Sequence, residues 1–159
     1  MKIRSGFVSN SSSSSFVVVS DGTLDQKTED AFMESIRKKY VKFVPFQNGA
    51  KCKFGWEEKE YNDVDTKLNW AFLQAYYAKK SRMANEKPLA LLRLLFKSHR
   101  IDIDECALNK AVDSDLAYID HQSCCYENER HLDIFKSSVK LRSFLFDSRS
   151  RLVTGNDNE

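Results

Sequence analysis

Residues 89–96 form a segment that is apolar nearly all round, so the rest of the chain has to enclose it. Pro88 directly precedes this segment, and proline is favoured in the first turn of a helix. A helix that is hydrophobic on every side is normally buried. We therefore predict a central helix here, and its apolar residues are Leu89, Leu91, Leu92, Leu94, Leu95 and Phe96.

Other segments repeat apolar residues at the spacing of an amphipathic helix. The clearest runs from Asp63 to Lys80, where Val64, Leu68 and Phe72 belong to one apolar stripe. Asp25 to Tyr40 ends in Arg37, Lys38 and Lys39, basic residues that suit the last turn of a helix. Further helical segments are predicted at residues 132–146, as one or two helices, and near residues 108–112.

Short β-prone segments lie between these predicted helices. Asn48-Gly49 is a strong signal for a tight hairpin turn, so we predict a hairpin over residues 41–57. Other strands are predicted at residues 1–8, 16–19, 116–119 and 151–154. Because strands and helices do not alternate regularly, the sequence predicts an α+β fold with a small, mainly antiparallel sheet packed against several helices.

The length of the chain, 159 residues, is typical of one domain. We find no internal repeat and no linker that would divide it, so we predict a single compact domain over residues 1–159. Within this domain, a serine-rich head with the first strand occupies residues 1–20. A polar C-terminal tail occupies residues 154–159.

The charge and hydropathy of the chain argue against some classes of partner. The net charge is +2 and the basic residues are scattered, whereas nucleic-acid binders usually carry a concentrated basic face. The longest apolar run is interrupted by Arg93 and is too short to span a membrane. Phe7-Val8 is too short for the apolar core of a signal peptide. We therefore expect a cytoplasmic protein with reduced thiols and no membrane association, for which a nucleic-acid partner is possible but not favoured.

The most unusual segment is a run of five serines, Ser11 to Ser15, which follows Asn10. Serine hydroxyls can stabilise turns, and successive backbone N–H groups in a turn can hold an anion. Adjacent hydroxyls are also ready acceptors of phosphate. Three hypotheses follow: a solvated loop or edge segment, a segment that is recognised or modified, and a ligand-binding loop. For the last, the candidate binding residues are Asn10, Ser11, Ser12 and Ser13.

A second polar motif occupies residues 120–125, where an acid and an imidazole stand beside an amide, a hydroxyl and two thiols. A histidine with a carboxylate is the minimal pair for general acid–base chemistry. If the C-terminal tail folds back, Asp157 can hydrogen-bond to His121 and fix its tautomer. We predict His121 as the catalytic residue with Asp120 and Asp157 in support, and as binding residues Gln122, Ser123 and Asn156.

Other hypotheses for the same motif remain open. Asp120 or Ser123 can simply cap a helix. Cys124 can act as a nucleophile beside His121, although no family signature surrounds it. Zinc binding by His121, Cys124, Cys125 and His131 matches no standard ligand spacing. We therefore predict no metal and no cofactor.

Two residues in the middle of the chain are further candidates for binding. Trp56 can stack on a base, although aromatic residues more often pack in a core. Asn69 lies inside an otherwise apolar helix beside Trp70. We predict that Asn69 hydrogen-bonds a buried backbone group or lines a pocket together with Glu57.

Several short motifs resemble a family of small proteins from tailed bacteriophages. They are the head from Met1 to Phe16, Phe54-Gly55-Trp56-Glu57, Lys67-Leu68-Asn69-Trp70, Asp120-His121-Gln122-Ser123 and Thr154-Gly155-Asn156-Asp157-Asn158. The resemblance spans most of the chain. It implies a phage-encoded accessory protein that acts in the cytoplasm of an infected bacterium, and it assigns no catalytic residue.

Three functions therefore compete. The leading hypothesis is an accessory protein that binds a host or phage macromolecule, most simply a protein. The second is a small hydrolase, a phosphoesterase or nuclease, that uses His121 with Asp120 and Asp157. The third is a substrate protein that is modified on its serine-rich head. The sequence leaves open whether the protein is an enzyme, and it does not indicate an oligomeric state.

Overall fold

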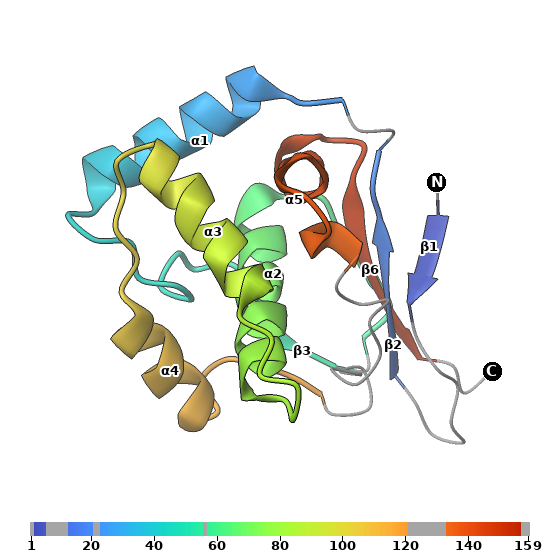
Figure 1. The fold of residues 1–159 in the computed structure, drawn as a ribbon. Helices are drawn as coiled ribbons and strands as arrows, with labels where there is room; N and C mark the ends of the chain where they lie inside the picture. Colours follow the sequence, from blue (N-terminus) through green and yellow to red (C-terminus); the bar gives the residue numbers. More distant parts are fainter. Residues whose placement is uncertain (1, 6–12, 21–22, 56, 121–132, 157–159) are drawn as a thin grey trace.

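A computed structural model describes residues 2–5, 13–20, 23–55, 57–120 and 133–156. Helices fill one side of the molecule and a sheet stands at the other side (Figure 1). The helices are α1 (Gln26–Lys39), α2 (Val64–Lys80), α3 (Lys87–Ser98), α4 (Glu105–Asp113) and α5 (Ser138–Phe146). The strands are β1 (Lys2–Ser5), β2 (Ser13–Val18), β3 (Lys53–Phe54), β4 (Lys59–Tyr61), β5 (Tyr118–Ile119) and β6 (Arg151–Asn156). The α+β prediction is confirmed.

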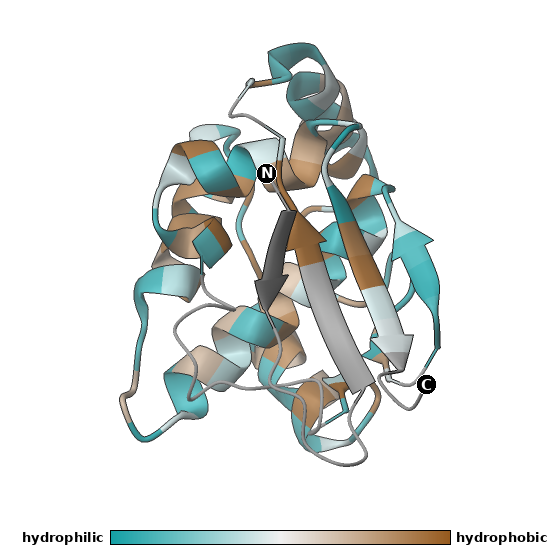
Figure 2. Ribbon diagram, turned by 90° about the vertical axis from the view of Figure 1, so that its right-hand side faces the viewer, coloured by the Kyte–Doolittle hydropathy of each residue, from teal (hydrophilic) through white to brown (hydrophobic). Residues whose placement is uncertain are grey.

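Four of these strands form an antiparallel sheet in the order β1-β2-β6-β4. The N-terminal and C-terminal strands are therefore direct neighbours, with Val17 opposite Leu152. In Figure 2 the sheet faces the viewer and the helices lie behind it. β3 and β5 form a separate pair of parallel strands.

Helix α2 is the centre of the fold. Twelve of its seventeen residues are buried, because α3, α4 and α5 all pack against it. Asp63 caps its first turn, where a carboxylate oxygen accepts a hydrogen bond from the Thr66 N–H at 2.7 Å. The helical periodicity of this segment is confirmed, but the helix is covered on nearly every side rather than on one stripe.

Helix α3 is present as predicted, but it does not hold the central position. Leu89, Leu92, Leu95 and Phe96 face the interior, whereas 63% of Leu94 is exposed. The prediction was wrong because it weighed the number of apolar residues alone. Two buried polar side chains of α2, Lys67 and Asn69, hydrogen-bond to backbone carbonyls inside the fold, which allows α2 to occupy the centre.

The predicted hairpin over residues 41–57 is wrong. Phe43 forms a parallel bridge with Ile103, and β3 pairs with β5. The Asn48-Gly49 turn is present, with a φ of 76° at Gly49, a conformation that glycine adopts easily. However, the Asn48 amide donates a hydrogen bond to the Asp65 carboxylate at 3.1 Å, which holds the turn against α2.

Part of the serine run, Ser13 to Ser15, belongs to strand β2, whereas Ser11 and Ser12 lie outside the described residues. β2 begins at Ser13, three residues earlier than predicted, and lies between β1 and β6. Ser13, Ser14 and Ser15 pair with Asn156, Gly155 and Thr154. Ser15 is also paired with Ser5 of β1. Backbone pairing satisfies N–H and C=O groups whatever the side chain, so the polar sequence does not prevent a strand here. The start of the predicted tail, residues 154–156, is likewise part of β6.

Candidate functional site

An open hollow of about 720 Å³ lies beside β4. We call it the β4 hollow. One wall is the segment from Gly49 to Lys53, and another is formed by Glu57 and all three residues of β4. The start of α2 contributes Asp63 and Thr66. Two strands that belong to different sheets therefore border the same space.

A hydrogen-bonded cluster of Lys51, Glu57 and Tyr61 stands in the β4 hollow. The Lys51 ammonium nitrogen lies 3.0 Å from Glu57 Oε1, and the Tyr61 hydroxyl donates to the same oxygen at 3.2 Å. The other carboxylate oxygen accepts the Gly55 N–H at 3.1 Å. Thr154 of β6 donates to the Glu57 backbone carbonyl at 2.6 Å, which ties the loop to the sheet. The cluster is therefore held from three parts of the chain.

These contacts shift the ionisation of all three groups. Burial alone would raise the pKa of Glu57, but its own backbone N–H, the Lys51 ammonium and the Gly55 N–H hold that pKa below its ordinary value. Burial alone would lower the pKa of Lys51, yet the bond to Glu57 and its charge raise it. Burial and the charge of Glu57 raise the pKa of the Tyr61 hydroxyl. The carboxylate is thus fixed as an ion, which makes it a poor proton acceptor.

Glu57→Gln tests this cluster. We expect the free energy of unfolding to fall by about 1 kcal/mol at neutral pH, because the amide loses a charge-assisted bond to Lys51. A folded-state pKa below the unfolded value stabilises the protein above the unfolded pKa, near 4, and this stability is lost as the pH falls through the folded pKa. The free energies of unfolding of the two proteins, measured by urea titration from pH 7 to pH 3, should therefore converge at the acid end. Curves that stay parallel would contradict this assignment.

The acidic side chains around the β4 hollow are all engaged, whereas two of its lysines are not. Asp63 caps α2, and the Glu60 carboxylate lies 3.4 Å from Arg151 Nε. Within the described ranges, Lys53 and Lys59 contact no carboxylate. Their ammonium groups lie over the rings of Tyr118 and Tyr61, 5.7 and 5.4 Å from the ring centres. The charge left available in the hollow is therefore positive.

Asn69 supports the wall of the β4 hollow from behind. Its side chain is fully buried, and its amide donates to the Lys51 carbonyl at 3.0 Å and to Asn48 Oδ1 at 3.0 Å. The predicted hydrogen bond to a backbone group is confirmed. Asn69 therefore positions Lys51, and it does so without reaching the hollow itself.

Few of the other predicted site residues are described. Ser13 and Asn156 are paired with each other across β2 and β6. The remaining predicted residues lie outside the described ranges: Asn10, Ser11, Ser12, Trp56, His121, Gln122, Ser123 and Asp157. Cys124, Cys125 and His131 also lie outside them. The acid–base hypothesis for His121 therefore stays a prediction.

Asp120 is the one member of the predicted acid–base group that the structure describes. It follows β5 directly and is half-buried, and its N–H donates to the Phe54 carbonyl at 2.7 Å. A Cβ placed on Gly55 would lie 3.8 Å from the Asp120 Cβ and 3.8 Å from Glu57 Oε2. The motif that begins at Asp120 therefore starts next to the Lys51–Glu57–Tyr61 cluster.

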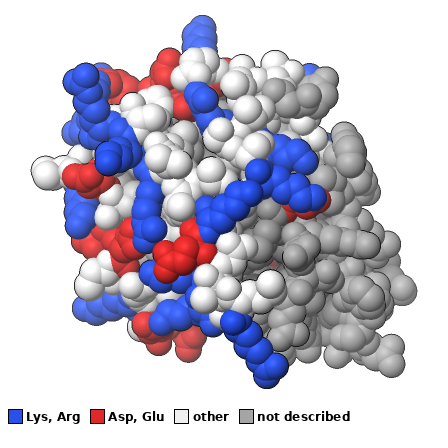
Figure 3. Space-filling view, in the orientation of Figure 1, with Lys and Arg blue, Asp and Glu red and all other residues white. Residues whose placement is uncertain are grey.

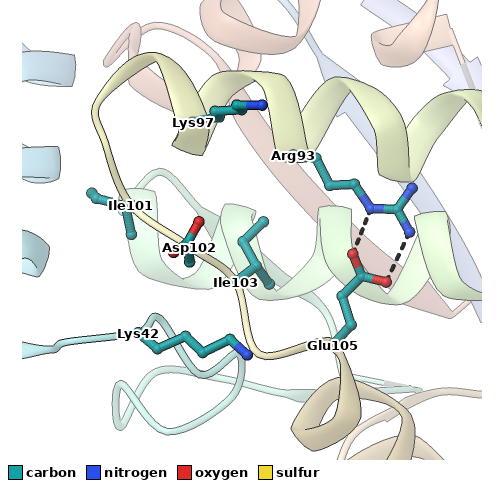
Figure 4. A pocket seen from close by; sticks show the side chains of 7 residues that line it. All are labelled: Lys42, Arg93, Lys97, Ile101, Asp102, Ile103 and Glu105. Atoms are coloured by element: carbon teal, nitrogen blue, oxygen red, sulfur yellow. Dashed lines mark hydrogen bonds and ion pairs between the residues drawn. The ribbon is translucent and has the colours of Figure 1, made fainter.

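A second hollow, of about 430 Å³, lies between α3 and the segment that leads into α4 (Figure 4). Arg93 donates two parallel hydrogen bonds to Glu105, at 2.5 and 2.8 Å, and this pair joins the two helices. Lys42 and Lys97 also line the space. Because the Arg93–Glu105 pair connects α3 to α4, we assign this pair a structural role.

The wider surface shows no single dominant charge on the face that Figure 3 presents, where basic and acidic side chains are interspersed. Across the described part of the chain, no group of three or more histidine, cysteine or acidic side chains is placed to hold a metal ion. Nor does any described helix have the length and apolarity needed to cross a membrane.

Comparisons with known proteins give no match. No family model, no curated protein and no solved structure matches this chain. The functional argument therefore depends on the residues of this chain alone.

The sequence pointed to this neighbourhood through Glu57 and Asn69 but missed Lys51, Lys59 and Tyr61. Lysine and tyrosine carry no motif that separates a site from an ordinary surface. One available signal was that lysines and aromatic residues are both frequent between residues 51 and 61.

Proposed function

We propose that this chain is a phage-type accessory protein that binds a macromolecular partner through the β4 hollow and carries out no chemistry there. The observation that carries this proposal is the charge state of the hollow. Its acids are held by partners of their own, and two exposed lysines stand at its border with no carboxylate among the described residues.

The cluster inside the hollow also favours binding over catalysis. A general base needs a pKa near the working pH, whereas the pKa of Glu57 is lowered. A lysine nucleophile needs a lowered pKa, whereas the pKa of Lys51 is raised. The groups are therefore arranged to stay charged and fixed, as in a recognition surface. The phage context is the part of the proposal that comes from the sequence resemblance.

A capture experiment tests the proposal. The tagged chain, the double variant Lys53→Glu/Lys59→Glu and the control Lys140→Glu are each used to retain proteins from a lysate of infected bacteria. Lys140 is an exposed lysine in the first turn of α5, so its reversal changes the net charge without touching the hollow. We expect the double variant to lose the retained partner at least tenfold and the control to keep it. No partner above background with the unaltered chain would refute the proposal.

A further inference from the structure

The β4 hollow runs along the free edge of a strand. Among the described strands, β4 is hydrogen-bonded to β6 alone, and no described residue pairs with its other edge. All three consecutive residues of β4 border the hollow, and none of the described β6 residues does. Because successive side chains of a strand point to opposite faces, a space that touches all three lies along the edge rather than over one face.

The opposite wall also presents backbone groups that no described strand pairs. The Cys52 carbonyl accepts the Tyr118 N–H at 3.0 Å, and the Phe54 carbonyl accepts the Asp120 N–H at 2.7 Å. In a parallel pair, alternate residues turn their N–H and C=O groups toward the partner strand. The residue between them, Lys53, therefore directs its backbone groups away from β5. The hollow lies between two strands that can each accept further backbone hydrogen bonds.

The charges at this edge select the occupant. Lys53 and Lys59 line the hollow, and their ammonium groups, which lie over the rings of Tyr118 and Tyr61, contact no carboxylate of the described residues. A second copy of the chain is a poor occupant. Antiparallel pairing of β4 with itself would bring no free acidic side chain to Lys53 and Lys59, because Glu60, the one acid of β4, is already held by Arg151.

From this geometry we infer that the β4 hollow binds an extended, acidic peptide segment of the partner, which adds as a strand to the free edge of β4. Main-chain hydrogen bonds to the edge would supply affinity, as in other strand-addition complexes. The two lysines would pair with acidic side chains of the segment and so select it. This inference rests on the proposed binding function and names the chemistry of the partner.

Titration of the full chain with synthetic peptides tests the inference. The probe is a blocked eight-residue peptide that alternates valine and glutamate. The first control peptide has lysine in place of glutamate. The second keeps the glutamates but carries N-methyl groups on every backbone nitrogen, so it keeps the charge and loses the donors that strand addition needs on both of its edges.

Binding is followed by ¹⁵N–¹H NMR and by calorimetry. With the glutamate peptide, we expect the largest shifts at the amides of Lys59, Glu60, Tyr61 and Lys53. We also expect binding at least tenfold weaker in Lys53→Glu/Lys59→Glu and unchanged in Lys140→Glu. The N-methylated and lysine peptides should bind at least tenfold more weakly than the probe.

Each alternative outcome overturns the inference in a different way. Equal binding of the N-methylated peptide would show charge attraction without strand addition, and equal binding of the lysine peptide would exclude selection of acidic segments. Absence of binding would contradict recognition of an acidic strand by this protein. Chemical shift changes away from β4 would show that the peptide binds outside the β4 hollow. If lysate capture still depends on Lys53 and Lys59 while the peptides fail, the proposed function stands and the strand-addition inference falls.

Discussion

Phe43→Ala is expected to lower the free energy of unfolding by about 3–5 kcal/mol, the usual cost of truncating a fully buried aromatic side chain. Only 1% of Phe43 is exposed, and its ring stacks on Phe96 with centroids 4.8 Å apart. The ring of Phe72 in α2 is also close, with its centroid 5.9 Å from that of the Phe43 ring. Truncation would therefore leave a cavity between α2 and α3. Urea denaturation followed by circular dichroism measures the loss.

Val41→Ala is the matched control for this prediction. Val41 lies two residues away in the segment that the sequence assigned to one hairpin strand, and it is fully exposed. We expect a change within about 0.5 kcal/mol, as for most surface substitutions. If both variants lose similar stability, the two side chains share an environment, as alternate residues of a regular strand do. That result would contradict the structure of this segment.

The helices were predictable because their signals are local. Asp25 and Asp63 each accept the N–H three residues later, which fixes the start of α1 and α2. Pro88 occupies the first turn of α3. Caps and helical periodicity depend only on residues within a few positions of each other, so a single sequence contains them.

The strand pairing of residues 41–57 was not predictable in the same way. β3 and β5 are separated by more than sixty positions, and no local pattern encodes that pairing. A proline at position 45 was the overlooked warning, because proline within a β-prone run argues against a regular strand. The Asn48-Gly49 signal identified a turn correctly, but the contact between Asn48 and Asp65 decides what that turn connects.

The sequence indicated the β4 hollow only indirectly, through Asn69 and Glu57. Asn69 stood out because a polar residue inside an otherwise apolar helix needs a partner, and it has two. Glu57 was named only as lining a pocket together with Asn69. Lys51 and Tyr61 both contact the Glu57 carboxylate, and Thr154 of β6 holds the Glu57 backbone. Exposed lysines are common on protein surfaces, so a lysine in the sequence does not by itself indicate a site. Lys59 becomes a candidate because it lies at the edge of β4 that no described residue pairs with.

Lys67 is the buried charge that the sequence did not reveal. It sits at the core of α2 with no exposed surface, and its ammonium nitrogen donates to the Asp147 and Ser150 carbonyls at 3.3 and 3.1 Å. The Phe144 ring lies beside it, 5.8 Å from nitrogen to ring centre. Lys67 therefore joins α2 to the turn between α5 and β6. Burial lowers its pKa from 10.5 to about 8, although the charges of Asp63 and Asp147 partly oppose this.

This depressed pKa predicts a stability that rises with pH in an alkaline window. Between pH 8 and 10.5 the unfolded chain keeps the Lys67 proton while the folded protein releases it, so the unfolded state binds more protons and the free energy of unfolding increases with pH. From pH 7.5 to 9.5 we expect a gain of about 2 kcal/mol. The measurement stays below pH 10 because of Tyr76, whose pKa is raised to about 12 in the folded protein. Above pH 10 the unfolded chain releases the Tyr76 proton while the folded protein keeps it, so the free energy of unfolding decreases with pH.

Lys67→Met and Lys80→Met separate this contribution from other titrations. Methionine fills a similar volume without an ammonium group, so the gain between pH 7.5 and 9.5 should vanish in Lys67→Met whatever the stability of that variant at neutral pH. Lys80 is exposed at the end of the same helix, and its replacement should leave the gain intact. Urea titrations at five pH values measure all three slopes. A Lys67→Met curve parallel to that of the unaltered protein would mean that the ammonium group does not lose its proton in the folded state, and that its two carbonyl bonds outweigh the cost of burial.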